Sequence, residues 1–405
     1  MSSSIRNILV FAGWYPNEYN LFEGVFVRDQ MQYLADYGNL YNYGISPKIS
    51  VIKLMPPVDL PNFLFRRKRK IKNEEIEKEK MKIFYGQDFL LSARFQEHSR
   101  RKKLKLVGSL YKKAVAYFGA SPDVILAVTL PALEVAHLLH KQLCLDIPVI
   151  LHEHSVPLEM HMRTELEKQQ RILALNSADA IIVTADRQIP EVKKYLGLEI
   201  PLYKIWNPIN RGFLNAVPKL ENKNNDALEL ISVGFLNEQK AIHRLIKAVS
   251  LIPKDILHLV HIIGDGPEKV RLQKMSVNLG IQDRVKFWGF QSHEEIAEQM
   301  KVCDGLVLCS KRENCPNVLI EAQYMGLPCI VTRNDASERI ILPGNGISVE
   351  QDEGEALAKG ITDFFEQKSS FQPSEIRKKA IQAFSPETFS KDFFDVFKQQ
   401  LSSKP

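Results

Sequence analysis

The sequence predicts an α/β protein built from two doubly wound, parallel-sheet domains. Short apolar runs with strand character alternate with helix-like patterns along the chain, which is typical of parallel α/β sheets. The chain has 405 residues, more than one ordinary core holds. The alternation stops at a turn around Asn207-Pro208 and a polar stretch at Asn222–Asp226, and then starts again. We therefore expect domains over 1–208 and 209–385, and a terminal helix over 386–405 that can return to the first domain.

The expected strands are runs of three to seven mostly apolar residues, many of them β-branched. In the first domain they are Ile8–Phe11, Ile49–Leu54, Val124–Val128, Val149–His152 and Ile181–Thr184. In the second domain they are Leu228–Val233, Leu257–Ile263, Val285–Phe287, Gly305–Cys309, Cys329–Thr332 and Ile347–Val349.

Two glutamates stand out in the stretch RENCPNVLIEAQYMG. Pro316 suits the first turn of a helix, because the missing N–H would have no partner there. Glu313 then lies in the loop after a strand, and Glu321 lies inside the helix. A lone charge is costly to bury, so the simplest reading leaves both acids at the solvent edge. Loops after the carboxyl ends of parallel strands, however, are where open α/β sheets bind ligands.

Composition indicates a globular protein of the cytoplasm. Hydrophobic residues make up 45% of the chain. No apolar run reaches the ~18 residues of a membrane span, and the start lacks the cleavage site of a signal peptide. The five cysteines contain no C-x-x-C pair, so we expect reduced thiols.

The positive charge is local. Residues 66–113 hold 17 Lys or Arg and six Asp or Glu, whereas the whole chain has a net charge of +6. The clusters are Arg66–Lys72 and Arg100–Lys105, with apolar Phe63–Phe65 just before the first. One hypothesis is a solvated insertion; another is that residues 63–113 dock on an anionic membrane surface, which would make the protein peripheral on the inner face of the cytoplasmic membrane. Nucleic acid is not expected as a partner, because no binding module appears.

Motifs that would indicate several other classes of ligand are missing from the sequence. The chain reads FAGWYPN after its first strand, and GDG at Gly264–Gly266 has Lys269 at the third glycine position, so a nicotinamide cofactor is not expected. No Walker motif occurs, and no D-x-D pair is present to hold a divalent metal. His152 and His154 are spaced to share one face of a strand, but they have no further Cys or His partner. We expect neither metal nor cofactor.

Several motifs, in order, resemble the retaining GT-B glycosyltransferases of family 4, the "group 1" type. The family's E-x7-E element resembles RENCPNVLIEA, and its A-x-x-x-G-x-P element matches Ala322 to Pro328. The stretches VGFLNEQKAIHRLIKA, IIGDGPE, VKFWGF and CDGLVLCS fall in the family's order. In the first half WYPNEYNLFEGVFVRDQ, PDVILAV, VILHEHS and ADAIIVTA also match. The resemblance implies two Rossmann-like domains that face each other across a cleft.

The resemblance also implies roles for particular residues. Glu313, His154 and Lys240 would be the catalytic residues, with Glu313 and His154 at the transferred sugar. The expected donor-binding residues are Gly24, Lys240, Asn314, Cys315, Pro316, Asn317, Val318 and Glu321. The helix N-terminus would bind the diphosphate through backbone N–H groups, and Glu321 the ribose. Phe235 stands where the family has an arginine, and Arg28, Arg312 or Arg333 would have to compensate.

The expected function is the transfer of a sugar from a nucleotide-diphosphate sugar to a lipid-linked or cell-envelope glycan. Within the family the donor is most often a UDP-sugar, with GDP-mannose next. The leaving diphosphate would act as the base, without a metal ion. Two alternatives stay open: an epimerase or phosphorylase on the same two-domain plan, and an inactive protein that only binds sugar nucleotides.

Overall fold

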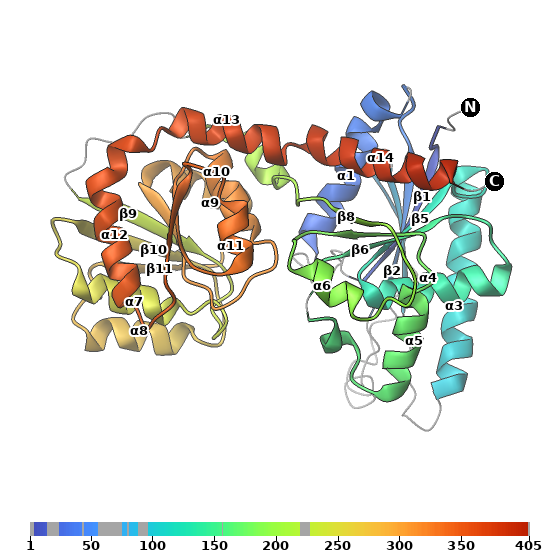
Figure 1. The fold of residues 1–405 in the computed structure, drawn as a ribbon, viewed down its shortest axis with the longest axis horizontal. Helices are drawn as coiled ribbons and strands as arrows, with labels where there is room; N and C mark the ends of the chain where they lie inside the picture. The colour runs from blue at the N-terminus through green and yellow to red at the C-terminus, as the bar shows by residue number, and fades with distance from the viewer. Residues whose placement is uncertain are drawn as a thin grey trace. The chain divides into compact units, whose positions relative to one another are not determined.

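The computed structural model describes residues 4–13, 24–42, 44–55, 75–78, 81–87, 96–155, 157–218 and 227–403. The chain divides into two compact units, of which the first is Met1–Trp206 with Phe389–Pro405 and the second is Asn207–Thr388. Each unit contains one sheet with helices packed around it (Figure 1). Part of the first-half motif (Trp14–Glu23), the first basic cluster with the apolar residues before it (Phe63–Lys72) and the polar stretch Asn222–Asp226 lie outside the described residues.

The first sheet has the strand order β3-β4-β2-β1-β5-β6-β7-β8. All pairs are parallel except β3 with β4. The strands are β1 (Asn7–Ala12), β2 (Lys48–Met55), β3 (Glu75–Lys78), β4 (Met81–Gln87), β5 (Val124–Val128), β6 (Val149–Glu153), β7 (Ala180–Val183) and β8 (Leu202–Lys204). Its central strands are buried on both faces, as expected for a parallel sheet covered by helices.

The second sheet has the order β11-β10-β9-β12-β13-β14, and all its pairs are parallel. The strands are β9 (Leu228–Val233), β10 (Leu257–Ile263), β11 (Val285–Gly289), β12 (Gly305–Leu308), β13 (Cys329–Thr332) and β14 (Gly346–Val349). In both sheets the order reverses beside the first strand of the unit, which is the doubly wound arrangement. The two sheets confirm the predicted α/β class.

Helices connect successive strands and follow the last strand. In the first unit they are α1 (Val25–Tyr41), α3 (Gln96–Phe118), α4 (Leu130–Leu143), α5 (Glu165–Leu175) and α6 (Gln188–Lys193). In the second unit they are α7 (Ile242–Leu251), α8 (Lys269–Asn278), α9 (His293–Val302), α10 (Asn317–Tyr324), α11 (Asp335–Ile340), α12 (Glu355–Gln367) and α13 (Pro373–Phe384). None of the helices in the described part of the chain has the length and apolarity needed to cross a membrane.

The last helix, α14 (Pro386–Ser402), belongs to the first unit from Phe389 onward. The Ser390 hydroxyl donates to the Tyr33 carbonyl of α1, and the Tyr203 hydroxyl of β8 donates to Gln399. The ring of Phe393, which is fully buried, lies 5.0 Å from that of His152 in β6. These contacts join segments at opposite ends of the sequence into one core.

Strands β3, β4 and β8 are missing from the sequence prediction. Strand β4 lies inside the charged segment 66–113, yet it pairs with β2 and buries Met81, Ile83 and Phe84. The hypothesis of a solvated insertion is therefore wrong for Met81–Gln87. Lysines before and at the amino end of the strand masked its apolar pattern in the sequence, and only the pairing with β2 makes it part of the core.

Aspartates fix the amino ends of both sheets. The Asp123 carboxylate, before β5, accepts from the N–H groups of Arg6 and Asn7 at 2.7 and 2.8 Å. The Asp179 carboxylate accepts from the Val149 N–H at 2.7 Å, and that of Asp304 accepts from the Glu229 N–H at 2.9 Å. Each aspartate thus satisfies a backbone donor at the start of a neighbouring strand. The opposite, carboxyl edge is left for the loops of the candidate site.

At that carboxyl edge, the turn after β10 packs directly on the turn after β9. A Cβ atom on Gly264, which has φ 136°, would lie 1.9 Å from the Gly234 carbonyl oxygen. Gly280 has φ 66° and open space around the same position. Gly264 is therefore required by both its backbone and its contact, whereas Gly280 is favoured by its backbone alone.

We expect Gly264→Ala to lower the free energy of unfolding by about 3 kcal/mol or more, because the two turns must separate. The matched control Gly280→Ala should cost only about 1 kcal/mol, the strain of a left-handed alanine. Urea unfolding of both variants measures the difference. Equal losses would contradict the close packing of the two turns.

Candidate functional site

The candidate site of the second unit is formed by the loops after β9 and β12 and by the start of α10. Its centre is an ion pair: the Lys240 ammonium donates to the Glu313 carboxylate at 2.6 Å. The Glu313 side chain is 9% exposed and that of Lys240 is 22% exposed. The two residues are 73 positions apart in the sequence. The structure thus brings together the predicted lysine and the first acid of E-x7-E, and each charge offsets the cost of burying the other.

The backbone next to this pair is strained. Ala241 follows Lys240 and caps α7 with φ 50° and ψ 37°, the left-handed region. For a residue other than glycine this conformation costs roughly 1–2 kcal/mol. The Ala241 carbonyl accepts from the Arg244 N–H at 2.9 Å and from the Cys309 thiol at 3.4 Å. These contacts hold the turn that presents Lys240 to Glu313.

Helix α10 begins one residue later than the sequence suggested. Pro316 is the N-cap residue, outside the helix, and no side chain caps the first turn. The first backbone N–H groups of the helix are those of Asn317, Val318 and Leu319, and of these the Leu319 N–H already donates to the Pro316 carbonyl at 2.9 Å. The Asn317 side chain accepts from Asn207 at 2.8 Å. The expected anion site at this helix end is therefore reduced to the amides of Asn317 and Val318.

The remaining predicted donor residues lie around this helix end. Glu321 is buried within α10, while Asn314, Cys315 and Val318 are half-buried. Desolvation of the thiolate raises the pKa of Cys315 to about 12, so this cysteine is a neutral thiol at pH 7. Glu321 is thus enclosed, and the other three residues are accessible in part.

The arginines proposed to compensate for Phe235 differ in their contacts. The Phe235 ring is exposed. Arg28 pairs with Asp29 at 2.9 Å, and Arg333 pairs with Glu338 and Glu350. The Arg312 guanidinium is exposed, and it forms no hydrogen bond or ion pair with the residues that the structure describes. Arg312 is therefore the candidate whose charge is not already balanced.

In the first unit, Gly24 and His154 are linked through Phe26. Gly24 is the N-cap of α1 with φ 66°, and its carbonyl accepts from the Val27 and Arg28 N–H groups at 2.9 and 3.2 Å. The Phe26 ring lies 4.9 Å from the His154 ring, which lies 4.0 Å from that of His152. The helix that Gly24 caps thus contacts the predicted His154 through Phe26, at the carboxyl end of β6.

Both histidines are neutral at physiological pH. Burial lowers the pKa of His154 to about 3, because the imidazolium would lose its hydration. Burial lowers the pKa of His152 well below its usual value, and the nearby His154 lowers it further. His154 therefore offers a neutral imidazole, which donates a hydrogen bond from one nitrogen and accepts at the other.

Glu153 supports His154, although it is not among the residues predicted for the site. Its fully buried carboxylate accepts from the N–H groups of Leu130, His154 and Ser155 at 2.6, 2.9 and 2.8 Å. The Ser155 hydroxyl adds a fourth donor at 2.6 Å. Burial raises the pKa of this carboxyl, and the four donors oppose that rise. No motif signalled this role, because the donors are backbone groups that converge only in the folded chain.

The described part of the chain contains no group of three or more His, Cys, Asp or Glu side chains arranged to hold a metal ion. Charged groups at the site of the second unit include Lys240, Glu313 and the exposed Arg312. Each is a protein side chain able to contact a ligand directly.

Residues 216–383, within the second unit, match a known family model. That family is described as glycosyl transferases group 1. The second unit matches the group 1 glycosyltransferases. The matched residues include Lys240, Glu313 and Glu321, the residues around which the site of this unit is built.

Two curated relatives illustrate the similarity. The lipopolysaccharide core biosynthesis glycosyltransferase LpsE of Rhizobium meliloti is 31% identical over 183 residues, covering 44% of this chain and 51% of LpsE. The N-acetyl-alpha-D-glucosaminyl L-malate synthase of Bacillus anthracis is 32% identical over 116 residues, covering 29% of this chain and 30% of that enzyme. The chain thus spans about half or less of the length of these relatives.

Solved structures match over nearly the whole chain. Sucrose-phosphate synthase from Thermosynechococcus elongatus has a TM-score of 0.73 at 17% identity and covers 98% of this chain and 100% of its own. The lipopolysaccharide outer core galactosyltransferase WaaB has a TM-score of 0.72 at 18% identity, covering 97% and 99%. HepE of Anabaena, in complex with UDP, has a TM-score of 0.69 at 17% identity, covering 98% and 100%. These likenesses confirm the predicted GT-B fold class.

The burial of His154 predicts a specific dependence of stability on pH. The unfolded chain takes up a proton near pH 6.5, whereas the folded chain resists protonation down to about pH 3. The contribution of His154 to the free energy of unfolding is therefore fully present above pH 6.5 and is lost as the pH falls toward 3.

We expect His154→Gln to reduce the loss of unfolding free energy between pH 7 and pH 5 by about 1–2 kcal/mol in urea titrations. His258→Gln, at an exposed position, is the control and should leave that loss unchanged; equal pH profiles for parent and His154→Gln would contradict the assignment.

Proposed function

We propose that this protein is a retaining glycosyltransferase that moves a sugar from a nucleotide-diphosphate sugar to a glycan acceptor. The observation that carries the proposal is the Lys240–Glu313 ion pair beside the N-terminus of α10. It places a cation, a helix end and a buried carboxylate at the carboxyl edge of a parallel sheet, within the residues that match the group 1 glycosyltransferases. This set of groups suits a diphosphate next to a sugar ring.

The donor we propose is a UDP-sugar, with GDP-mannose as the next choice. The likeness to HepE, whose structure contains UDP, supports UDP. The acceptor we propose is a lipid-linked or cell-envelope glycan, and the names of LpsE and WaaB, both concerned with lipopolysaccharide, support that class.

In the proposed reaction, the diphosphate lies against Lys240 and the N-terminus of α10. A helix end acts like about half a positive charge and favours an anion by about 0.3–2 kcal/mol, which is too little alone for a diphosphate. A charge-assisted hydrogen bond from Lys240 adds about 1.5–3 kcal/mol. Arg312 supplies a second cation at the position next to Glu313, in place of the arginine that Phe235 replaces.

The chemical step breaks the bond between the anomeric carbon and the diphosphate oxygen. The acceptor hydroxyl forms its new bond on the same face of the sugar and gives its proton to the departing diphosphate. Glu313 stabilises the positive charge that develops on the sugar, and Glu321 holds the ribose. His154, as a neutral imidazole, hydrogen-bonds the transferred sugar without adding charge.

Glu313→Gln should lower kcat by about 100-fold or more while the donor KM stays within about twofold, because its charge acts in the transition state. Glu321→Ala should instead raise the donor KM by about tenfold, through loss of a hydrogen bond to a charged group. Transfer from a labelled UDP-sugar measures both, with the exposed Glu298→Gln as control. Parental transfer by Glu313→Gln would refute its role. Epimerised nucleotide without transfer would favour an epimerase.

Transfer should persist in excess EDTA. In the proposed site the negative charge of the diphosphate is balanced by Lys240, Arg312 and backbone amides rather than by a bound cation. Lys240→Ala should lower kcat/KM by about 100-fold with or without EDTA, because a cation contact to the leaving group is lost. Loss of the parent's activity in EDTA, with recovery on adding Mg²⁺ or Mn²⁺, would overturn metal independence.

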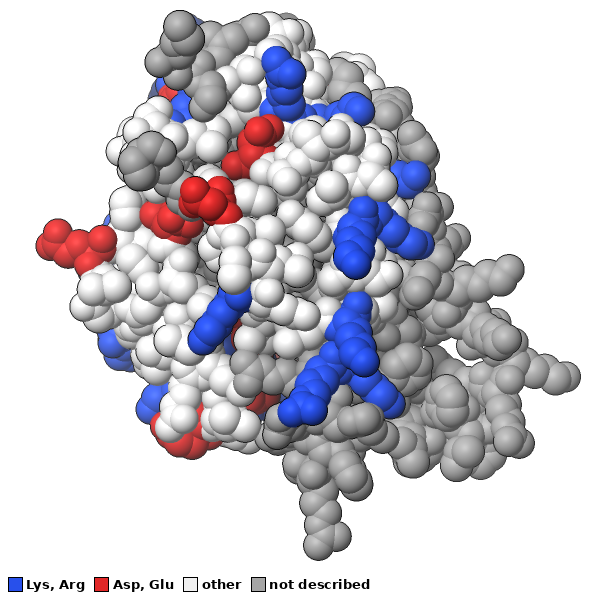
Figure 2. Space-filling model, turned by 90° about the vertical axis from the view of Figure 1, so that its right-hand side faces the viewer, with Lys and Arg blue, Asp and Glu red and all other residues white. Residues whose placement is uncertain are grey.

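We also propose that the basic face of α3 docks on anionic lipid. Arg101, Lys102, Lys105 and Lys112 are exposed, whereas Val107 and Leu110 are buried in the core of the first unit. Figure 2 shows a group of Lys and Arg side chains on the right of one face of the molecule, where few Asp or Glu side chains lie. Each such cation contributes about 1 kcal/mol at an anionic surface.

The triple variant Lys102→Gln, Lys105→Gln and Lys112→Gln should weaken binding to vesicles that contain anionic lipid, with transfer to a soluble acceptor unchanged. A variant with the same change of charge, Lys254→Gln, Lys359→Gln and Lys378→Gln in the second unit, should bind like the parent. Binding should weaken with salt, because screening acts over ~10 Å at 0.1 M. Co-sedimentation at low and high salt measures it, and equal binding to neutral vesicles would rule out the lipid dock.

A further inference from the structure

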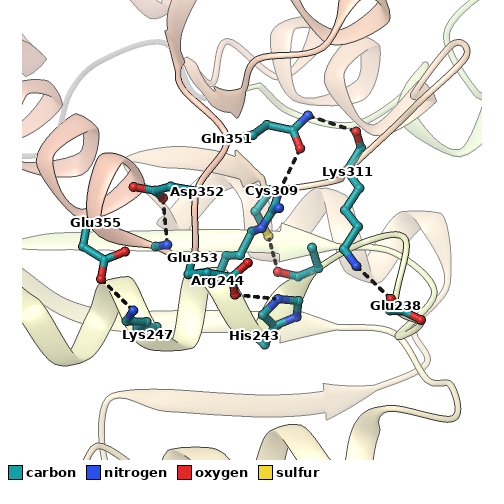
Figure 3. A network of polar contacts seen from close by, with 12 residues as sticks. Glu238, His243, Arg244, Lys247, Cys309, Lys311, Gln351, Asp352, Glu353 and Glu355 are labelled. Carbon is teal, nitrogen blue, oxygen red and sulfur yellow. Dashed lines mark hydrogen bonds and ion pairs between the residues drawn. The ribbon is translucent and has the colours of Figure 1, made fainter.

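Gln351 connects three segments at the carboxyl edge of the second sheet. It follows β14, and its side-chain oxygen accepts from the Arg244 guanidinium of α7 at 3.0 Å. Its amide nitrogen donates to the Lys311 carbonyl at 2.9 Å and to the Arg333 carbonyl at 2.7 Å. Figure 3 shows Gln351 between Arg244 and Lys311. One side chain thus joins α7 to the loops after β12 and β13.

Arg244 fixes which way this amide points. Arg244 is 8% exposed, and its Nε atom has no hydrogen-bond partner among the described residues. The backbone of Arg244 also packs closely against Gly354. A Cβ atom at position 354 would lie 2.7 Å from the Arg244 carbonyl oxygen. A guanidinium only donates, so the oxygen of Gln351 must face Arg244 and both amide hydrogens must face the carbonyls. Only an amide side chain offers this acceptor and two donors together.

The loop that carries Glu313 lies between Gln351 and a second glutamine. Gln239 donates from its side chain to the Arg312 carbonyl at 2.9 Å, and its own carbonyl accepts from the Lys311 N–H at 2.8 Å. The next residue along, Glu313, meets Lys240 at 2.6 Å. The two carbonyls before Glu313, those of Lys311 and Arg312, therefore each accept a hydrogen bond from a different glutamine side chain.

We infer that Gln351, oriented by Arg244, is a positioning residue for the Glu313 carboxylate; this inference rests on the proposed function. The peptide groups of Lys311 and Arg312 determine the position of the Glu313 backbone. Two side chains donate hydrogen bonds to their carbonyls, and Gln351 is one of the two. The carbonyl of Arg333 ties the same amide to the loop after β13. Without these donors the loop gains freedom, and the carboxylate spends less time at the reacting sugar.

The test is Gln351→Glu, which keeps the acceptor for Arg244 and removes both donors. We expect kcat to fall by about 10- to 100-fold with the donor KM within about twofold. The control Glu355→Gln breaks the Lys247–Glu355 pair in the same network and should behave like the parent. In a Glu313→Gln background, Gln351→Glu should cause no further loss of kcat, because it acts through that carboxylate.

Hydrogen exchange of residues 309–316 is a readout that needs no activity. Exchange in this loop should be faster in Gln351→Glu, and in the uncharged Gln351→Met, than in Glu355→Gln. Parental exchange and parental kcat in both Gln351 variants would overturn the inference, as would a further loss of kcat on the Glu313→Gln background. If the parent protein transfers no sugar but the Gln351 variants exchange faster, the positioning role of Gln351 would stand. The proposed function would then be refuted instead.

Discussion

The parallel pairing of β12 with β9 and with β13 is the constraint on which the second unit depends. It aligns Leu306 with Ile231 and with Cys329, so the three strands end at one edge. Lys240, Glu313 and Gln351 all follow strands that end there, although they are far apart in the sequence. A change of register would move these loops relative to one another. The ion pair and the Gln351 contacts both require the observed alignment.

Several charged groups in the two units are buried together with polar partners. The Glu153 carboxylate receives four donors, and Glu313 receives the Lys240 ammonium. The Arg244 guanidinium is oriented by a single side-chain acceptor, Gln351. Such groups cost free energy when a partner is removed, since the remaining charge stays buried. This cost explains why the loops at the two carboxyl edges adopt defined positions.

Similarity to known proteins is uneven along the chain. The family model matches residues 216–383, whereas the fold likeness extends over 97–98% of the chain at 17–18% identity. The second unit carries the ion pair, the α10 N-terminus and the close turns, which restrict residue type at many positions. In the first unit a parallel sheet tolerates many apolar sequences, because its strands need only β-forming residues that fill the core.

The sequence by itself determined the two-domain α/β architecture, because central parallel strands are buried on both faces and therefore appear as apolar runs. It also singled out Lys240, Glu313, Glu321 and His154 as candidate site residues. Only the tertiary structure decided that Lys240 and Glu313 form an ion pair, that β4 belongs to the sheet, and that Glu153 and Gln351 hold the loops. These features depend on hydrogen bonds and strand pairings between distant segments, and such contacts exist only after the chain has folded.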